Sequence, residues 1–220
     1  MEIFGLELAD PLTFVTDVLM SVVAFYCGHK LFYSFDAKFA KLTGLFFLFL
    51  GLSSLIGGTS HLLDLYFGKM PHLFAWMTQG LSILFVELAC VTLIKSRKIQ
   101  NLLRMVIYSF FGVFVSQLIS IQQFNVVKIN ATVGLIGFTS MIHIVKYFET
   151  KDQDFLNVPL SICLFILPAI IHGFDLRYNS WVNQNVLSHL VLLPCYYLLY
   201  RSFFRVTEKM ITSKTQPALQ

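Results

Sequence analysis

The stretch LTGLFFLFLGLSSLIGGTSHLLDLYF, residues 42–67, decides the fold of this chain. No Lys, Arg, Asp or Glu occurs in it before Asp64, and leucine and phenylalanine make up most of its first half. A helix needs roughly 20 apolar residues to cross the hydrocarbon core of a bilayer, and this run is long enough. The stretch therefore predicts a transmembrane helix.

The same pattern recurs along the whole chain. Hydrophobic residues make up 56% of the 220 residues, and charged residues only 13%, against about 25% in a typical soluble domain. Seven segments are long and apolar enough to span a bilayer: 11–33, 42–67, 71–94, 102–121, 129–148, 158–175 and 184–205. We therefore predict an all-α membrane protein, a single seven-helix transmembrane domain over residues 1–210 followed by a flexible cytoplasmic tail over 211–220.

The distribution of basic residues predicts the orientation. Residues 1–10 contain three acids and no Lys or Arg, whereas a signal peptide begins with positive charge, so we expect the first span to be retained. With the N-terminus outside and the C-terminus in the cytoplasm, basic residues concentrate on the inner side, as the positive-inside rule requires. The inner group is Lys30, Lys38, Lys41, Lys95, Arg97, Lys98, Arg104, Lys146, Lys151, Arg201, Arg205, Lys209 and Lys214; the outer group is Lys69, Lys128 and Arg177.

This topology explains the formal net charge of +4 without nucleic acid as a partner. It predicts a multi-pass integral protein of a cell or inner membrane, with the lipid bilayer as its surroundings. The sequence leaves the oligomeric state open. The four cysteines all fall within predicted spans, and their spacing matches no zinc or redox motif. We expect them to be reduced packing residues, because free cysteine is commonly buried.

Polar residues gather in the outer half of the predicted bundle. Ionisable side chains at such depth are costly and usually face the bundle interior, so we expect this group to converge. Asn185 and His189 are four residues apart and share one helix face. The group comprises Asp17, His61, His72, Gln79, His172, Asn185 and His189.

Three histidines of this group, His61, His172 and His189, predict a metal site. Three histidines and a water form the usual ligand set of a catalytic zinc, which supplies hydroxide at neutral pH. Asp17 would then act as a general base or orient a histidine ring, and Ser60 or Asn185 would polarise a substrate carbonyl. The alternative is that each histidine only hydrogen-bonds a neighbouring helix; His72, directly after Pro71, also suits the interface.

Two polar residues lie deeper, and breakers interrupt several spans. Glu87 is either protonated or paired with Gln79 or His143, and it is a further pocket candidate that could mark a proton path. The breakers are Gly57-Gly58, Pro168 and Pro194. They are either ordinary membrane-helix packing features, where small residues let helices approach, or they open space around the polar group.

The residues in the second and seventh spans carry a family resemblance. Residues 57–61 read GGTSH and residues 185–189 read NVLSH. With seven spans and an outward N-terminus, the chain resembles the superfamily of alkaline ceramidases, adiponectin- and progestin-type receptors and related membrane hydrolases. In that family the second helix carries Ser-xxx-His, the seventh carries His-xxx-His, and these histidines bind zinc. The segment from His61 to Trp76 is also similar to the ceramidase segment that links helices 2 and 3.

Several positions depart from the pattern of the family. Gly57 stands where the family has serine, Asn185 replaces the first histidine of the seventh helix, and His72 lies about where an acidic residue opens the third helix. His61 and His189 match, and His172 could replace the missing ligand. The resemblance implies a zinc-dependent integral-membrane hydrolase that cleaves an amide or ester bond of a lipid.

Other functions compete with this hypothesis. The same polar group suits a non-enzymatic receptor, sensor or transporter that binds a small amphiphile without metal. Haem ligation by His61 and His189 is a third reading. A retinal protein is excluded because no Lys lies between Gln184 and Tyr200 to form a Schiff base.

Overall fold

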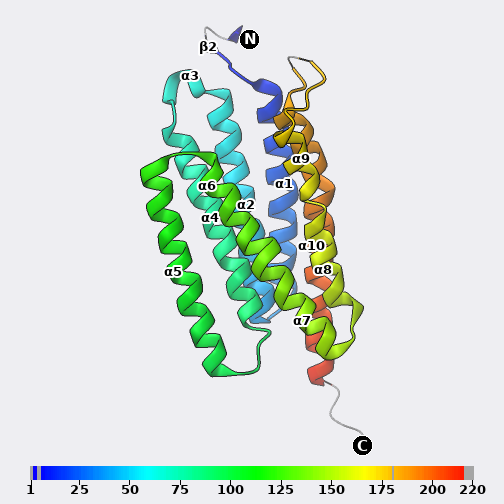
Figure 1. Ribbon diagram of the computed structural model, residues 1–220. Coiled ribbons are helices and arrows are strands. Elements are labelled where there is room, and N and C mark those ends of the chain that lie inside the picture. Colours follow the sequence, from blue (N-terminus) through cyan, green and yellow to red (C-terminus); the bar gives the residue numbers. More distant parts are fainter. Residues whose placement is uncertain (1, 4–5, 180, 216–220) are drawn as a thin grey trace, which may run out of the picture.

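The computed structural model describes residues 2–3, 6–179 and 181–215 and shows a bundle of helices (Figure 1). Among these residues, seven helices are long and apolar enough to cross a membrane, which confirms the predicted seven-helix architecture of a multi-pass membrane protein. The N- and C-termini lie at opposite ends of the bundle, as an odd number of crossings requires. We call these ends the N-terminal end and the C-terminal end.

The elements follow one another along the chain with short connections. A two-residue antiparallel pair, β1 (Glu2–Ile3) and β2 (Leu6–Glu7), precedes the helices. The helices are α1 (Pro11–Ser34), α2 (Lys38–Leu62), α3 (Asp64–Phe67), α4 (Met70–Val91), α5 (Arg97–Ile121), α6 (Phe124–Ala131), the π-helix η1 (Thr132–Thr139), α7 (Ser140–Thr150), α8 (Gln153–Cys163), α9 (Ile166–Gly173) and α10 (Gln184–Thr215).

Helices α1, α2, α4 and α10 form the centre of the bundle. Helix α2 packs between α1 and α4, α10 packs along α1, and α5 lies at one edge against α4. Apolar side chains fill the C-terminal half, where Phe39, Phe46, Phe47 and Phe203 are almost completely buried and meet mostly edge to face, the arrangement that the ring quadrupoles favour. This apolar half leaves the other end of the bundle for polar residues.

The predicted span 42–67 is wrong at both ends. Helix α2 begins earlier, at Lys38, and ends at Leu62, where the backbone N–H of Leu63 donates to the carbonyl of Thr59. The short helix α3 follows, and Gly68, at φ +56°, turns the chain toward α4. A residue other than glycine is strained at such a positive φ. His61 therefore lies in the last turn of its helix.

The fifth span crosses the bundle diagonally (Figure 1). It runs from Phe124 to Thr150 as α6, η1 and α7 without a break. Helix α6 packs against α4 and α5 at the N-terminal end, whereas α7 packs against α8 at the other end. The separation between the fifth span and α9 therefore increases toward the N-terminal end.

The sixth and seventh spans also differ from the predicted bounds. The sixth starts at Gln153 and is divided at Leu164–Phe165 into α8 and α9, just before Pro168, which cannot donate a backbone hydrogen bond. Helix α10 continues to Thr215, so the first part of the expected tail, 211–215, is helical; residues 216–220 lie outside the described part. All four cysteines are free, and Cys163, unlike the other three, is exposed.

Candidate functional site

A cavity of about 440 Å³ lies in the N-terminal half of the bundle. Helices α1, α2, α4, α6, α9 and α10 contribute the polar side chains named below, and η1 and α8 complete the wall. The polar lining includes Asp17, His61, His72, Gln79, Lys128, His172, Ser188 and His189, and the apolar lining includes Leu50, Trp76, Leu135, Ile136, Phe165 and Ile166. The cavity therefore has one polar region within largely apolar walls.

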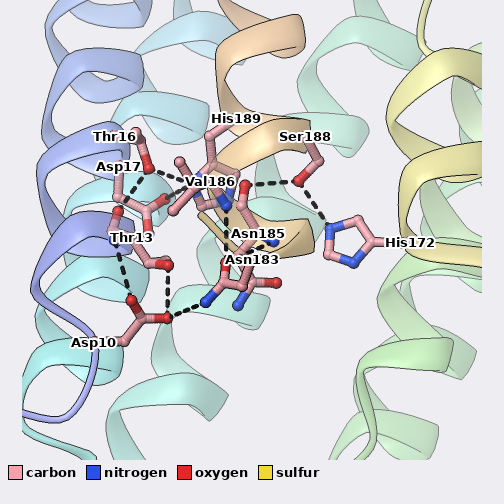
Figure 2. A network of polar contacts seen from close by, with 10 residues as sticks. All are labelled: Asp10, Thr13, Thr16, Asp17, His172, Asn183, Asn185, Val186, Ser188 and His189. Carbon is pink, nitrogen blue, oxygen red and sulfur yellow. Dashed lines mark hydrogen bonds and ion pairs between the residues drawn. The ribbon is translucent and has the colours of Figure 1, made fainter. Parts of the chain in front are cut away.

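Asp17 and His189 face each other across α1 and α10 (Figure 2). Their Oδ1 and Nδ1 atoms are 3.7 Å apart, and Asp17 is only 4% exposed. The Thr16 hydroxyl lies within donor distance of the carbonyl of Thr13 and 3.0 Å from His189 Nδ1. If the hydroxyl proton goes to the Thr13 carbonyl, His189 Nδ1 is the donor to Thr16; in the other tautomer the hydroxyl donates to Nδ1. His189 Nε2 remains available for a ligand.

Asp17 is not fully satisfied by these contacts. Its Oδ2 atom is buried and has no hydrogen-bond partner. The carboxylate packs against Gly58 of α2, where an added Cβ would lie 2.6 Å from the Cβ of Asp17. Gly58 thus makes room for a buried acid, a close approach that no larger residue allows.

His172 on α9 is held by Ser188 on α10 (Figure 2). The two side chains are 3.0 Å apart, from Nε2 to Oγ, and the Ser188 hydroxyl lies within donor distance of the carbonyl of Asn185. If the Ser188 proton goes to that carbonyl, His172 Nε2 donates to Ser188; in either tautomer His172 Nδ1 takes no part in this contact. Sequence reasoning missed Ser188 and Thr16, although each directly precedes a predicted site residue.

His61 and His72 form a third pair, across α2 and α4. Their ring centroids are 5.1 Å apart and nearly perpendicular. His72 Nε2 lies 3.4 Å from Asp64 Oδ1, and its ring centroid lies 5.9 Å from that of Trp76. His72 is thus part of the cavity wall as well as a residue of the bundle end.

The structure does not bring every predicted residue into this cavity. Asp17, His61, His72, Gln79, His172 and His189 all line it, but Ser60, Asn185 and Glu87 are not among the lining residues. Ser60 is buried and its hydroxyl donates to the carbonyl of Ile56 on the same helix. The backbone N–H of Asn185 donates to Asn183 Oδ1 at the start of α10.

Glu87 lies deeper, beside η1. An added Cβ at Gly134 would be 3.2 Å from its Oε1 atom, so the carboxyl group packs against that glycine. Among the described residues, no hydrogen bond joins Glu87 to Gln79 or His143. His143 instead donates from Nδ1 to the carbonyl of Thr139, and its Nε2 is buried without a partner.

The three histidines predicted to bind zinc line one cavity, but each contacts a different residue. His61 contacts His72, His172 contacts Ser188, and His189 contacts Thr16. Within the described part of the chain, no group of three or more His, Cys, Asp or Glu side chains could hold a metal ion as arranged. Two of the rings, His172 and His189, each contact a hydroxyl through one nitrogen and keep the other nitrogen free of that contact. Zinc therefore stays a prediction.

Comparison with known proteins gives one family. No curated protein and no solved structure matches the chain. A family model described as "Family of unknown function (DUF6962)" matches residues 12–208, which include all seven spans almost completely. The chain belongs to this family of unknown function.

Proposed function

We propose that this protein binds a small amphiphile in the cavity at its N-terminal end, as a receptor, sensor or transporter. The observation that carries the proposal is the cavity itself: imidazole, amide and hydroxyl groups from several helices meet within largely apolar walls. Ligand pockets combine a mostly hydrophobic lining with a few polar groups that fix orientation. Such a lining suits a ligand with one polar head and one apolar chain.

The polar groups other than Lys128, which is exposed on α6, favour an uncharged head group. The carboxylate of Asp17 already faces His189, and that of Asp64 faces His72. Imidazole, amide and hydroxyl groups can donate or accept hydrogen bonds. A hydroxyl or amide head group would use both capacities without bringing a further charge into a site of low polarity.

The cavity reaches the side of the bundle that faces lipid. Ile136 on η1 and Ile166 on α9 both line it, yet they are 45% and 47% exposed. Helix α9 packs mainly on α10, whereas α6 and η1 pack on α4, so the two spans diverge at this level (Figure 1). An apolar chain could enter sideways from the bilayer through this opening.

The proposed orientation places the cavity in the outer leaflet. Most of the basic residues belong to the C-terminal end of the bundle, where the positive-inside rule puts the cytoplasm. The cavity lies at the opposite end. A protease-protection assay with tags at each terminus tests this orientation.

Filling the cavity should abolish binding. An added Cβ at Gly57 would meet only the Cβ of Ala75, 3.9 Å away, so Gly57→Phe should project its ring into the cavity. We expect mass spectrometry of the purified protein to find a co-purifying amphiphile on the wild type and at least about tenfold less on this variant, a loss of about 1.4 kcal/mol in binding.

Gly112→Phe is the matched control. Gly112 is exposed on α5, has no atom within 4 Å of an added Cβ and does not line the cavity. This variant should keep the amphiphile. Equal amounts of bound amphiphile on the wild type and on Gly57→Phe, with both variants folded, would contradict the proposal.

A second candidate function is a zinc-dependent hydrolase of a lipid amide or ester. It is favoured by one observation, that His61, His172 and His189 line the same cavity, and by the resemblance to the ceramidase and adiponectin receptor superfamily. Bound zinc would supply a hydroxide near neutral pH. Each of His172 and His189 keeps one ring nitrogen free of the hydroxyl contacts, and Asp17 lies beside His189.

Metal content tests this candidate directly. It predicts about one equivalent of zinc per chain, held by neutral imidazoles, and a large loss in His61→Ala. Elemental analysis of protein purified without added chelator measures it. Less than about a tenth of an equivalent, unchanged by the substitution, would reject the zinc site but leave the amphiphile proposal standing.

A further inference from the structure

A groove between α8 and α10 lies toward the C-terminal end of the bundle, away from the candidate site. Its volume is about 750 Å³, and it shares no lining residue with the first cavity. Arg201 and Arg205 line its polar part, whereas Leu160, Leu164 and Leu198 line its apolar part. The groove therefore combines two cations with an apolar channel.

The floor of the groove is fixed by hydroxyl contacts between the two helices. Ser161 Oγ and Ser202 Oγ lie 2.9 Å apart and are buried. Each hydroxyl also has a backbone partner: Ser161 donates to the carbonyl of Asn157, and Ser202 lies within donor distance of that same carbonyl. These contacts join α8 to α10, so the groove is formed before any ligand arrives.

The two arginines form no ion pair with a described carboxylate, although Arg205 also lines a second hollow that contains Asp36, Asp154 and Glu208. They are four residues apart on one helix face, about 6 Å along the axis. No Asp or Glu lines the groove, and within the described residues no carboxylate lies within 4 Å of either guanidinium group. Lys209, one turn further along α10, differs: its ammonium group lies 3.3 Å from Asp152 and 3.8 Å from Asp154.

The apolar part of the groove faces the lipid side of the bundle. Leu160 is 57% exposed and Leu198 is 43% exposed. Leu164 and Leu198 lie deeper in the bundle than Arg201 and Arg205, because α8 and α10 run in opposite directions and Ser161 meets Ser202, whereas Leu160 lies level with the two arginines. A ligand in the groove would thus meet arginine near the membrane surface and leucine deeper in the hydrocarbon.

We infer that the groove binds one anionic phospholipid from the leaflet at the C-terminal end. Its phosphate lies between Arg201 and Arg205, because guanidinium groups bind phosphate oxygens through paired hydrogen bonds. One acyl chain lies along Leu164 and Leu198. The lipid phosphate supplies the negative charge next to these arginines, because no carboxylate lines the groove. This inference does not depend on the function proposed for the first cavity.

Native mass spectrometry of the full chain in detergent tests the inference. The probes are phosphatidylglycerol and phosphatidylcholine with the same acyl chains, and inorganic phosphate. We expect one phosphatidylglycerol to bind, at least about tenfold more tightly than phosphatidylcholine. The double variant Arg201→Gln/Arg205→Gln should lose this preference, whereas Lys209→Gln, whose charge already has carboxylate partners, should keep it within about twofold.

Three results would overturn the inference. They are equal binding of both lipids to the wild type, an undiminished preference in the double variant, and displacement of phosphatidylglycerol by inorganic phosphate at equal concentration, which would indicate a site for free phosphate. If the double variant does not fold, the single variants decide. Each should lower the preference about threefold, and two singles that match the wild type overturn the inference.

Discussion

We expect Gly58→Ala to destabilise the bundle and to damage the candidate site together. The new Cβ would lie 2.6 Å from the Cβ of Asp17, a distance that real Cβ atoms do not show. The Asp17 Cβ is fixed to the backbone of α1, so only a separation of α1 from α2 can relieve the clash. Overpacking of this kind lowers the free energy of unfolding by about 1–3 kcal/mol. Thermal unfolding in detergent measures it.

Gly57→Ala is the matched control, one residue earlier on the same helix. Its Cβ would meet only the Cβ of Ala75, at an ordinary contact distance of 3.9 Å. Without a clash, alanine is favoured over glycine in a helix by about 1 kcal/mol. The neighbouring substitutions should therefore change stability in opposite directions. Equal destabilisation by both would show that the packing of α1 on Gly58 is not the cause.

The second large effect is expected from Asp17→Asn, which should maintain or raise stability while binding is lost. Asp17 Oδ2 is buried without a partner, and an uncharged amide of the same size costs no more to bury than a carboxyl group. The substitution also removes the acidic group that lines the cavity and lies 3.7 Å from His189 Nδ1. We expect at least about tenfold weaker amphiphile binding, measured by retention of the co-purifying ligand, with no fall in the unfolding temperature.

Asp10→Ala should have the opposite effects, a loss of stability with binding retained. Asp10 caps α1: its Oδ1 accepts from the backbone N–H of Thr13, and its Oδ2 accepts from the Thr13 hydroxyl and from the amide of Asn183 on the segment before α10 (Figure 2). Loss of such a cap lowers stability by about 0.5–2 kcal/mol. Asp10 does not line the cavity, so binding should persist. A stable Asp17→Asn variant that binds normally would remove Asp17 from the site.

The existence of the seven spans could be predicted from hydropathy, but several ends could not. Helix α5 begins at Arg97 and α6 at Phe124, each five residues before the predicted start of its span. In both cases the missed turn contains basic residues, such as Lys98 and Lys128, which lie just outside the predicted spans 102–121 and 129–148. A long basic side chain can extend from a helix to the membrane surface, so charge alone does not end a helix.

The depth of the site residues could be predicted, but their rotation about the helix axes could not. Topology places Ser60 and His61 at one level, yet His61 lines the cavity while Ser60 bonds back to Ile56. Their side chains differ by one position, about 100° around the helix. Likewise, partners such as Thr16 and Ser188 depend on contacts between α1, α9 and α10, which no periodicity in a single helix reveals.

The π-helix η1 constrains how many residues the fifth span can contain. In η1 the hydroxyl of Ser140 and its backbone N–H both reach the carbonyl of Leu135, five residues earlier, instead of four. Deleting one residue between 136 and 139 would restore ordinary α-helical winding and turn everything before it by about 100° relative to His143. Leu135 would then leave the cavity wall, so a relative with the same cavity should conserve this spacing in any alignment.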